Sequence, residues 1–272
     1  MKIQLCLITI GRKHSLSLVL RCIKKCEKIG EIEYFAFNAG AKKEIKEWLE
    51  KEGFKVIDVE QEPIEHNQIW ETLSGETRDL ERIKNFREDL NRKKIKNIFE
   101  TYKIVKANIL DDADFVWIIE DDQPFPPDAL PKMIEVFKKY PNAWVVAGVS
   151  YYWHQPTQRA FRNFWELKPI FQEKMRLEPI PYQGQTIDKI GATGTGCVLV
   201  KKEAIKSWEI EKYEPQIGPD IDFFRHVAAQ NKDAYGRWDL VIPHMTIYED
   251  GSVELVGRIQ KNLYPIIFGS NN

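Results

Sequence analysis

The chain has 272 residues, of which 43% are hydrophobic, and this is enough material for one large globular domain with its own core. Forty basic and forty-one acidic side chains leave a formal net charge of -1, which excludes a strong overall field for nucleic acid or an anionic membrane. We find no apolar run of the roughly 18 to 20 residues that a membrane span needs, and no signal-peptide pattern at the N-terminus. We therefore expect a cytoplasmic protein, with a peripheral position at a membrane left open. Its many Lys, Glu and Ile residues are typical of proteins from thermophiles.

The first sixty residues alternate between strand and helix patterns. Short apolar runs rich in β-branched and aromatic residues predict strands over 3–10, 32–40 and 54–60. Between them, apolar residues at helical spacing predict helices over 16–26 and 42–53. A β-α-β-α-β order implies a parallel sheet with helices on both faces.

The remaining chain continues this alternation with two less regular segments. Residues 95–105 keep a 3.6-residue period that predicts a long helix, and 143–153 read as a strand. The polar stretch 63–77 is expected to be a surface loop. Residues 151–186 are aromatic, contain prolines and show weak periodicity, which is more typical of a functional loop than of a plain connection.

Three carboxylates follow the strand at 116–119 without a gap. Ligands bind beyond the carboxyl ends of the strands in a parallel sheet, and Glu120, Asp121 and Asp122 stand at such an end. Residues i and i+2 of an extended chain point the same way, so Glu120 and Asp122 can face one cleft. Oxygen ligands of this kind suit Mg²⁺ or Mn²⁺, and a cation shared with a diphosphate would compensate their repulsion. An ordinary solvated turn is the alternative.

Three later stretches carry further candidate chemistry. The glycine-rich run 191–205 lacks the spacing of a Walker phosphate loop, so its glycines either admit a substrate close to the backbone or form a tight turn. Asp220 is expected to cap a helix, and at a cleft it could also accept a proton from a hydroxyl group. His244 follows a short apolar run, where it is either structural or a ligand beside the carboxylates.

In chain order, these stretches resemble a known family. They are similar to nucleotide-sugar-dependent glycosyltransferases of the GT-A fold, and most closely to the inverting, family-two-type enzymes. The matching motifs are "LITIGR", "YFAFNAG", "WIIEDD", "GTGCVLVKKEAI", "IGPDIDFFR" and "VIPHM". The resemblance spans about residues 3 to 250. It implies a Rossmann-like, mostly parallel α/β sheet in one domain, 1–272, with a nucleotide-sugar half to about residue 125 and an acceptor half from about residue 126.

The resemblance also assigns roles, residue by residue. It implies that Asp220 is the catalytic base, that Asp122 and His244 bind Mn²⁺ or Mg²⁺, and that a nucleoside-diphosphate sugar is the donor substrate. The acceptor would be the hydroxyl group of a sugar, a lipid-linked molecule or a protein. The residues it implies at the donor are Thr9, Arg12, Asn38, Lys103, Glu120 and Asp121.

Some features depart from the family pattern or fit another class. Glu120 stands where Asp is usual, and Pro219 replaces a common Glu, which leaves the base assignment between Asp220 and Asp222. A sugar nucleotidyltransferase is an alternative, because those enzymes have a loop rich in glycine and basic residues after their first strand, and "GRK" at 11–13 is a short match to it. A non-catalytic carbohydrate-binding protein is another, because residues 151–186 supply many aromatic platforms.

Overall fold

The computed structural model describes residues 1–40, 42–62, 80–154, 159–162, 164–169, 175–210, 218–247 and 253–256. Within the parts described, side chains are placed for all but a few short segments, the longest being 80–91. The surface loop expected at 63–77 lies outside the described residues.

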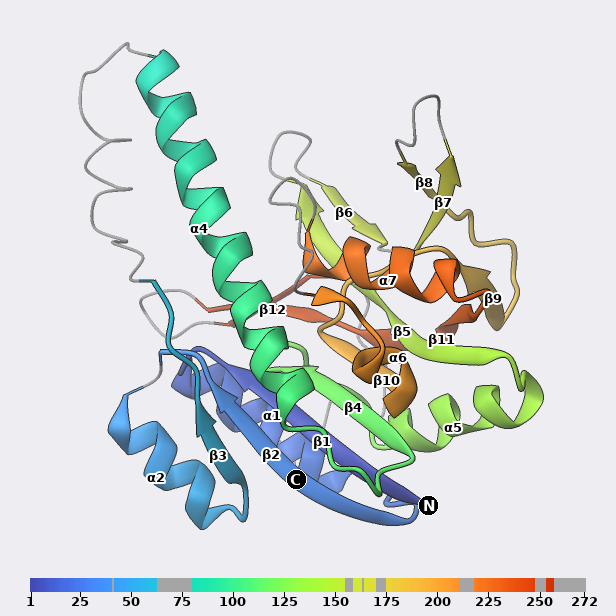
Figure 1. Cartoon of the computed structure of the whole chain (residues 1–272), viewed down its shortest axis with the longest axis horizontal. Helices are drawn as coiled ribbons and strands as arrows, with labels where there is room; N and C mark the ends of the chain where they lie inside the picture. The colour runs from blue at the N-terminus through green and yellow to red at the C-terminus, as the bar shows by residue number, and fades with distance from the viewer. Residues whose placement is uncertain are drawn as a thin grey trace, which may run out of the picture.

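One large sheet runs through the described part of the chain (Figure 1). Eight of its strands follow the order β3-β2-β1-β4-β10-β5-β11-β9, and β6 pairs with the end of β5. These strands are β1 (Lys2–Thr9), β2 (Glu31–Asn38), β3 (Lys55–Asp58), β4 (Phe115–Glu120), β5 (Ala143–His154), β6 (Arg159–Arg162), β9 (Ile187–Ile190), β10 (Cys197–Lys201) and β11 (Asp233–Ile242). Two hairpins lie beside it: β7 (Trp165–Pro169) with β8 (Met175–Pro179), and β12 (His244–Ile247) with β13 (Val253–Val256).

The sheet is mostly parallel, which confirms the predicted fold class. Strand β1 runs parallel to β2 and β4, β2 runs parallel to β3, and β5 runs parallel to β11. Inside the sheet, β10 is antiparallel to both β4 and β5, and at its margins β9 pairs antiparallel with β11 and β6 with β5. The first three strands therefore form the parallel unit that the β-α-β-α-β order predicts, and β4 and β10 join it to the rest of the sheet.

Helices cover both faces of the sheet, as the β-α-β-α-β order predicts. One face packs against α1 (Lys13–Lys25), α2 (Lys43–Lys51) and α5 (Ala129–Lys139). The other packs against α4 (Leu80–Ala107), α6 (Lys202–Lys206) and α7 (Pro219–Ala229) (Figure 1). Within β4, Trp117 and Ile119 belong to the first layer and Val116 and Ile118 to the second. Burial on both sides explains why this strand reads as one continuous apolar run.

Two helices begin at other residues than the sequence suggests. Helix α1 starts at Lys13, three residues before the predicted start at residue 16, and Arg12 stands in its N-cap position. Helix α7 starts at Pro219, so its N-cap is Gly218 and the prediction that Asp220 caps it is wrong. Proline suits the first helical position because its missing N–H would have no partner there, and this moves Asp220 one step into the helix.

The aromatic segment 151–186 contains more regular structure than its weak periodicity suggests. Strand β5 continues to His154, and β6, β7 and β8 follow in the same segment. Phe164 is buried, and Trp165 forms a β-bridge with Ala192, which ties the β7–β8 hairpin to the glycine-rich stretch. These contacts join residues far apart in the sequence, so no local pattern reports them.

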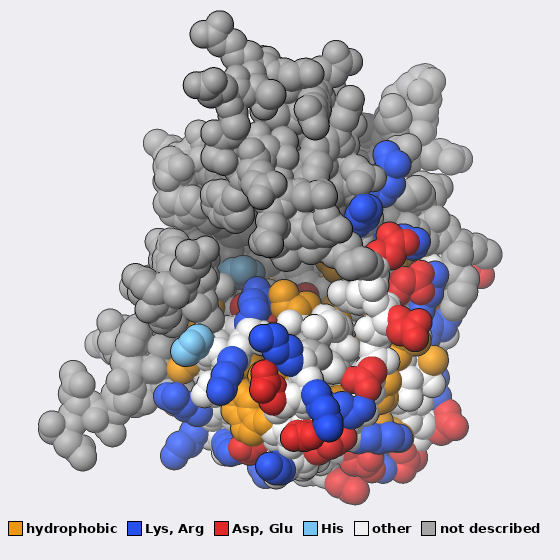
Figure 2. Space-filling model, turned by 90° about the vertical axis from the view of Figure 1, so that its left-hand side faces the viewer, with side chains coloured by type: hydrophobic (Ala, Val, Ile, Leu, Met, Phe, Trp, Pro, Cys, Tyr) orange, Lys and Arg blue, Asp and Glu red, His pale blue; other side chains and the backbone are white. Residues whose placement is uncertain are grey.

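The described surface carries mixed charge, and the described helices are not of the membrane-spanning kind. Basic and acidic side chains lie next to one another over the described surface in Figure 2, rather than in a block of one sign. None of the helices in the described ranges combines the length and the apolar character needed to cross a bilayer.

Candidate active site

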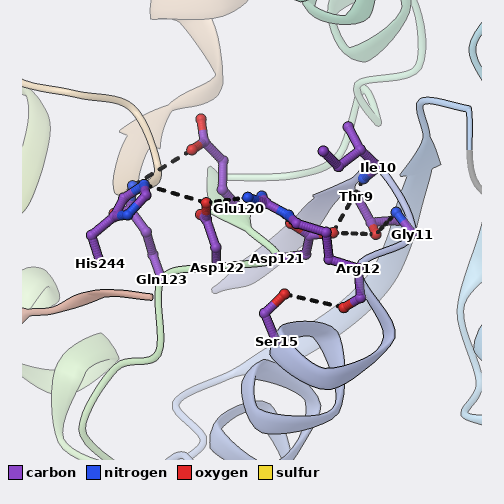
Figure 3. Close-up of polar contacts among 10 residues, drawn as sticks. All are labelled: Thr9, Ile10, Gly11, Arg12, Ser15, Glu120, Asp121, Asp122, Gln123 and His244. Carbon is purple, nitrogen blue, oxygen red and sulfur yellow. Dashed lines mark hydrogen bonds and ion pairs between the residues drawn. The ribbon is translucent and has the colours of Figure 1, made fainter. Parts of the chain in front are cut away.

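The acidic residues and the N-terminal loop meet because their strands are neighbours. In the parallel pair of β1 and β4, Ile8 lies opposite Glu120, so both strands end at the same edge of the sheet. Strand β2 ends beside them, with Asn38 opposite Thr9. The loop after β1 therefore lies directly against the three carboxylates at the end of β4, which are Glu120, its last residue, and Asp121 and Asp122 (Figure 3).

Asp121 anchors this loop. Its carboxylate accepts hydrogen bonds from the Thr9 hydroxyl (2.6 Å), the Ile10 backbone N–H (3.2 Å), and Arg12 through Nε (3.1 Å) and Nη2 (2.5 Å). Burial raises the pKa of Asp121, and Arg12 and the Thr9 hydrogen bond oppose that rise. Both oxygens of Asp121 are thus already engaged by the protein, which makes it the residue that shapes the loop.

Asp122 lies between Arg12 and His244. Its Oδ2 is 2.7 Å from Arg12 Nη1 and 3.3 Å from His244 Nε2. The backbone N–H of Met245 donates to the Asp122 carbonyl at 2.8 Å, and this fixes β12 next to the acidic turn. The other carboxylate oxygen, Oδ1, is buried and has no hydrogen-bond partner. The structure therefore brings together the two residues expected at a metal, and it leaves one oxygen of Asp122 available.

Glu120 has an unusual environment for a carboxyl group. Burial, followed by repulsion from Asp122, raises the pKa of Glu120 to about 8, although Arg12 opposes this. Gln123 is a close polar neighbour, whose Nε2 lies 3.5 Å from Glu120 Oε2. The carboxyl group is consequently protonated through most of the neutral range, and it can donate a hydrogen bond to a ligand.

A cavity of about 180 Å³ opens beside these groups, between the ends of β1 and β2 and helix α4. Apolar side chains on its wall include Ile10 and Ile98, and polar ones include Gln61 and Thr101. Glu120 and Asp121 form its acidic end. Pockets with mostly apolar walls and a few fixed polar groups are typical small-molecule sites, and this one has room for a flat ring.

Asp220 approaches the site from α7. Its Oδ1 accepts the Ile221 backbone N–H at 2.9 Å, and burial raises the pKa of its carboxyl group. Repulsion from Asp220 also contributes to the raised pKa of Glu120, so the two carboxyl groups share one electrostatic environment. Asp222, the other candidate base, accepts a hydrogen bond from Trp208 Nε1 at 2.8 Å and serves the packing of α7.

Asn38 and Lys103 are less directly placed for the expected donor contacts. Asn38 lies at the correct strand end, but its side-chain amide donates to Asp58 Oδ1 at 2.8 Å. Lys103 pairs with Glu100 at 2.8 Å on α4, whereas the residues of α4 that line the cavity include Thr101 and Tyr102.

Sequence reasoning missed three polar residues near the site. The Tyr102 hydroxyl donates to Thr195 Oγ1 at 2.6 Å, and the side chain of Gln123 packs directly on Gly196. Thr195 carried a signal, since it stands within the glycine-rich stretch. Tyr102 carried none, because it falls on the apolar stripe of α4 and reads as a core residue.

The residues present fit a divalent cation in part. The buried, unpartnered Oδ1 of Asp122 is a suitable ligand atom for Mg²⁺ or Mn²⁺, and His244 lies beside it. In the described part of the chain, no group of three or more His, Cys, Asp or Glu side chains is arranged to hold a metal. A cation here would therefore need oxygens from a bound diphosphate or water, as magnesium commonly does.

Comparison with solved structures identifies the class of fold. The chain has the GT-A glycosyltransferase fold: a mostly parallel central sheet flanked by helices, with the acidic site at its edge. No model of a protein family matches the sequence, and no curated protein matches it.

The particular structures that show this fold share little sequence with the chain. S. aureus TarS 1-349 in complex with UDP-GlcNAc is 11% identical, with a TM-score of 0.51, over 97% of this chain and 60% of that one. The mannosyltransferase PcManGT from Pyrobaculum calidifontis, in complex with GDP-Man and Mn²⁺, is 9% identical, with a TM-score of 0.50, over 88% and 55%. This chain thus spans under two thirds of either. A197 from STIV matches over 96% of this chain and 98% of its own, at 12% identity, but with a TM-score of only 0.47.

Proposed function

We propose that the protein is a glycosyltransferase that moves a sugar from a nucleoside-diphosphate sugar to an acceptor hydroxyl group, with inversion at the anomeric carbon. One observation carries the proposal: Glu120 and Asp121, at the end of β4, form the acidic end of a cavity in a GT-A fold, and the charge of Asp220 acts on Glu120. TarS and PcManGT, which share that fold, were solved with UDP-GlcNAc and with GDP-Man and Mn²⁺, which supports a donor of this chemical class.

The donor nucleotide would occupy the cavity between β1, β2 and α4. Its base would lie between Ile10 and Ile98, with Gln61 and Thr101 as hydrogen-bonding partners. Protonated Glu120 can donate to a hydroxyl of the ribose or of the sugar. Arg12, whose side chain is 40% exposed, is positioned to contact the diphosphate.

Asp220 would act on the acceptor. Its raised pKa brings the carboxylate closer to the basicity that general-base catalysis needs near neutral pH. We assign it the removal of the acceptor proton as the hydroxyl attacks the anomeric carbon, while the bond from that carbon to the diphosphate breaks. The nucleoside diphosphate then leaves with the bonding electrons.

A divalent cation, when bound at Asp122 with His244 beside it, would stabilise the charge that develops on the leaving diphosphate. The contribution of the chain is to hold Asp122 still. Arg12 and His244 contact one carboxylate oxygen, the Met245 N–H holds the backbone carbonyl, and the second carboxylate oxygen is left without a hydrogen-bond partner.

The substitution Asp220→Asn tests the proposal. We expect transfer to fall at least about a hundredfold, the usual size of a general-base contribution, because the amide cannot accept the acceptor proton. Binding of the donor should stay nearly unchanged. A thermal-shift panel of UDP-, GDP-, CDP- and dTDP-sugars, with and without Mn²⁺, first identifies the donor. The rate of sugar transfer and the affinity for that donor are then measured separately in Asp220→Asn.

Two outcomes would contradict the assignment. Equal loss of transfer and donor binding in Asp220→Asn would remove Asp220 from the role of base. Release of free diphosphate instead of a nucleoside diphosphate would indicate nucleotidyl transfer. Asp222→Asn is the matched control, since the Asp222 carboxylate binds Trp208 and its loss should affect stability more than transfer.

A further inference from the structure

Arg12 covers the acidic site from the solvent side. The side chains of Asp121 and Asp122 are 1% and 5% exposed, whereas that of Arg12 is 40% exposed. In Figure 3 its guanidinium lies between the two carboxylates. A cation that arrives from solvent therefore reaches the buried Asp122 past the guanidinium of Arg12 or past His244, whose side chain is 39% exposed.

The contacts of Arg12 use the geometry that only arginine offers. Nη1 lies 2.7 Å from Asp122 Oδ2, while Nη2 and Nε bind Asp121 Oδ1 at 2.5 Å and 3.1 Å. One planar group thus bridges two carboxylates that would otherwise repel each other. Burial lowers the pKa of Arg12, but Asp121 and Asp122 together raise it above its ordinary value, so the group is always charged.

This arrangement places a positive charge where a divalent cation would bind. Mn²⁺ at the free oxygen of Asp122 would lie close to a guanidinium that already holds the other oxygen of the same carboxylate. The two positive charges repel, and the negative charge that would attract the metal is partly neutralised. A bound diphosphate changes this balance, because its oxygens bind the metal and also give the guanidinium another partner.

We propose that Arg12 is a built-in competitor of the divalent cation: it keeps the affinity of the nucleotide-free protein for Mn²⁺ low, so that the metal enters together with the diphosphate. The statement that the metal enters together with the diphosphate rests on the proposed function. The statement that Arg12 lowers the affinity for Mn²⁺ concerns the nucleotide-free protein alone. Toward the metal, Arg12 acts through Asp122, whose Oδ2 it holds.

The test is a titration of the nucleotide-free protein with Mn²⁺, followed by the electron paramagnetic resonance signal of the free ion. We expect Arg12→Gln to bind Mn²⁺ at least tenfold more tightly than the unmodified protein. The Mn²⁺ affinity of Arg12→Lys should lie between those of Arg12→Gln and the unmodified protein, because a lysine keeps the charge but cannot bridge both carboxylates. Lys13→Gln is the matched control for loss of a nearby exposed charge, and its affinity should change less than twofold.

A double variant locates the effect. Adding Asp122→Asn to Arg12→Gln should abolish the gain, since the gain depends on the carboxylate that Arg12 releases. Equal Mn²⁺ affinity in Arg12→Gln and the unmodified protein, or a gain that survives in the double variant, overturns the inference. If Arg12→Gln does not melt cooperatively, Arg12→Lys takes its place in the titration. An Mn²⁺ affinity of Arg12→Lys equal to that of the unmodified protein would then overturn the inference.

The outcome is separable from that of the proposed function. The titration contains no nucleotide and measures no transfer, so a protein without glycosyltransferase activity would still show the gain in Arg12→Gln. Conversely, an active enzyme whose free form binds Mn²⁺ equally well with and without Arg12 would leave the function intact and refute the inference. Repeating the titration with UDP, GDP, CDP or dTDP present tests the coupling: the affinity of the unmodified protein should rise at least tenfold.

Discussion

A single glycine positions the candidate base. Gly218 precedes α7 with φ at -65°, a conformation open to any residue, so its backbone does not require glycine. A Cβ atom there would nevertheless lie 2.6 Å from Asp220 Oδ1, so an added side chain would force that carboxylate to move. The carboxylate of Asp220 therefore depends on a missing side chain two residues earlier.

We predict that Gly218→Ala displaces the Asp220 carboxylate and lowers transfer by roughly tenfold or more, in line with the cost of a misplaced catalytic group. Donor binding, measured by thermal shift, should be retained. Because the effect acts through Asp220, adding Gly218→Ala to Asp220→Asn should cause no further loss of transfer. A further loss in that double variant would show that Gly218 acts by another route.

At the scale of elements, one of the contacts that attach the aromatic segment to the sheet leaves no spare room. Phe164 is buried and lies on Gly236 in β11, where a Cβ atom would be only 2.4 Å from its ring. The ring also packs edge-on against Trp238, with centroids 4.9 Å apart, so it has little freedom to move away. Gly236 thus makes room for the side chain that connects the β7–β8 hairpin region to the central sheet.

Gly236→Ala should therefore destabilise the protein by about 1–3 kcal/mol, the usual cost of overpacking a core. Urea unfolding followed by circular dichroism measures this. In a Phe164→Ala background the same substitution should cost clearly less, because the ring that it meets is absent. Equal costs in the two backgrounds would mean that the strand, and not the ring, is intolerant of the added methyl group.

At the scale of the whole molecule, Glu120 makes stability depend on pH. With its pKa at about 8 in the folded state, against 4.5 as its ordinary value, the folded protein keeps a proton that the unfolded chain releases. This contribution is fully present below about pH 4.5 and is lost as the pH rises through about 8. Each unit of difference is worth about 1.4 kcal/mol, reduced by solvent that enters through the cavity.

We expect Glu120→Gln to flatten the dependence of the unfolding free energy on pH between about pH 5 and about pH 8, because the amide does not titrate. Urea titrations at several pH values measure the slope. Glu27→Gln, at an exposed position, is the control and should leave the slope unchanged. The same slope in Glu120→Gln and the unmodified protein would refute a raised pKa for Glu120.

Much of the fold was readable from local patterns. The apolar runs of β1, β2 and β4 and the stripes of α1 and α2 have physical causes that act within a few residues, such as alternating burial and helical periodicity. The order of these elements then leaves few topologies, because parallel strands need crossovers. Strands β6, β7 and β8 were not readable, since their pairing joins distant segments and follows no strong period.

The candidate site divides in the same way. Glu120, Asp121 and Asp122 could be found because adjacent carboxylates at the end of an apolar strand form a local pattern, and Asp220 could be found from the Gly-Pro break before it. Their separate roles could not be read. The engagement of Asp121 by four donor groups, the protonation of Glu120 and the free oxygen of Asp122 all depend on neighbours from other elements.

By itself, therefore, the sequence determined the alternation of strands and helices and the place where acidic chemistry gathers, because periodicity and strand ends are local properties. Only the tertiary structure decided what each acidic group can do. Hydrogen bonds, burial and charge act through space over a few ångströms, and the residues that supply them to the carboxylates, Thr9, Arg12 and His244, lie more than a hundred positions away along the chain.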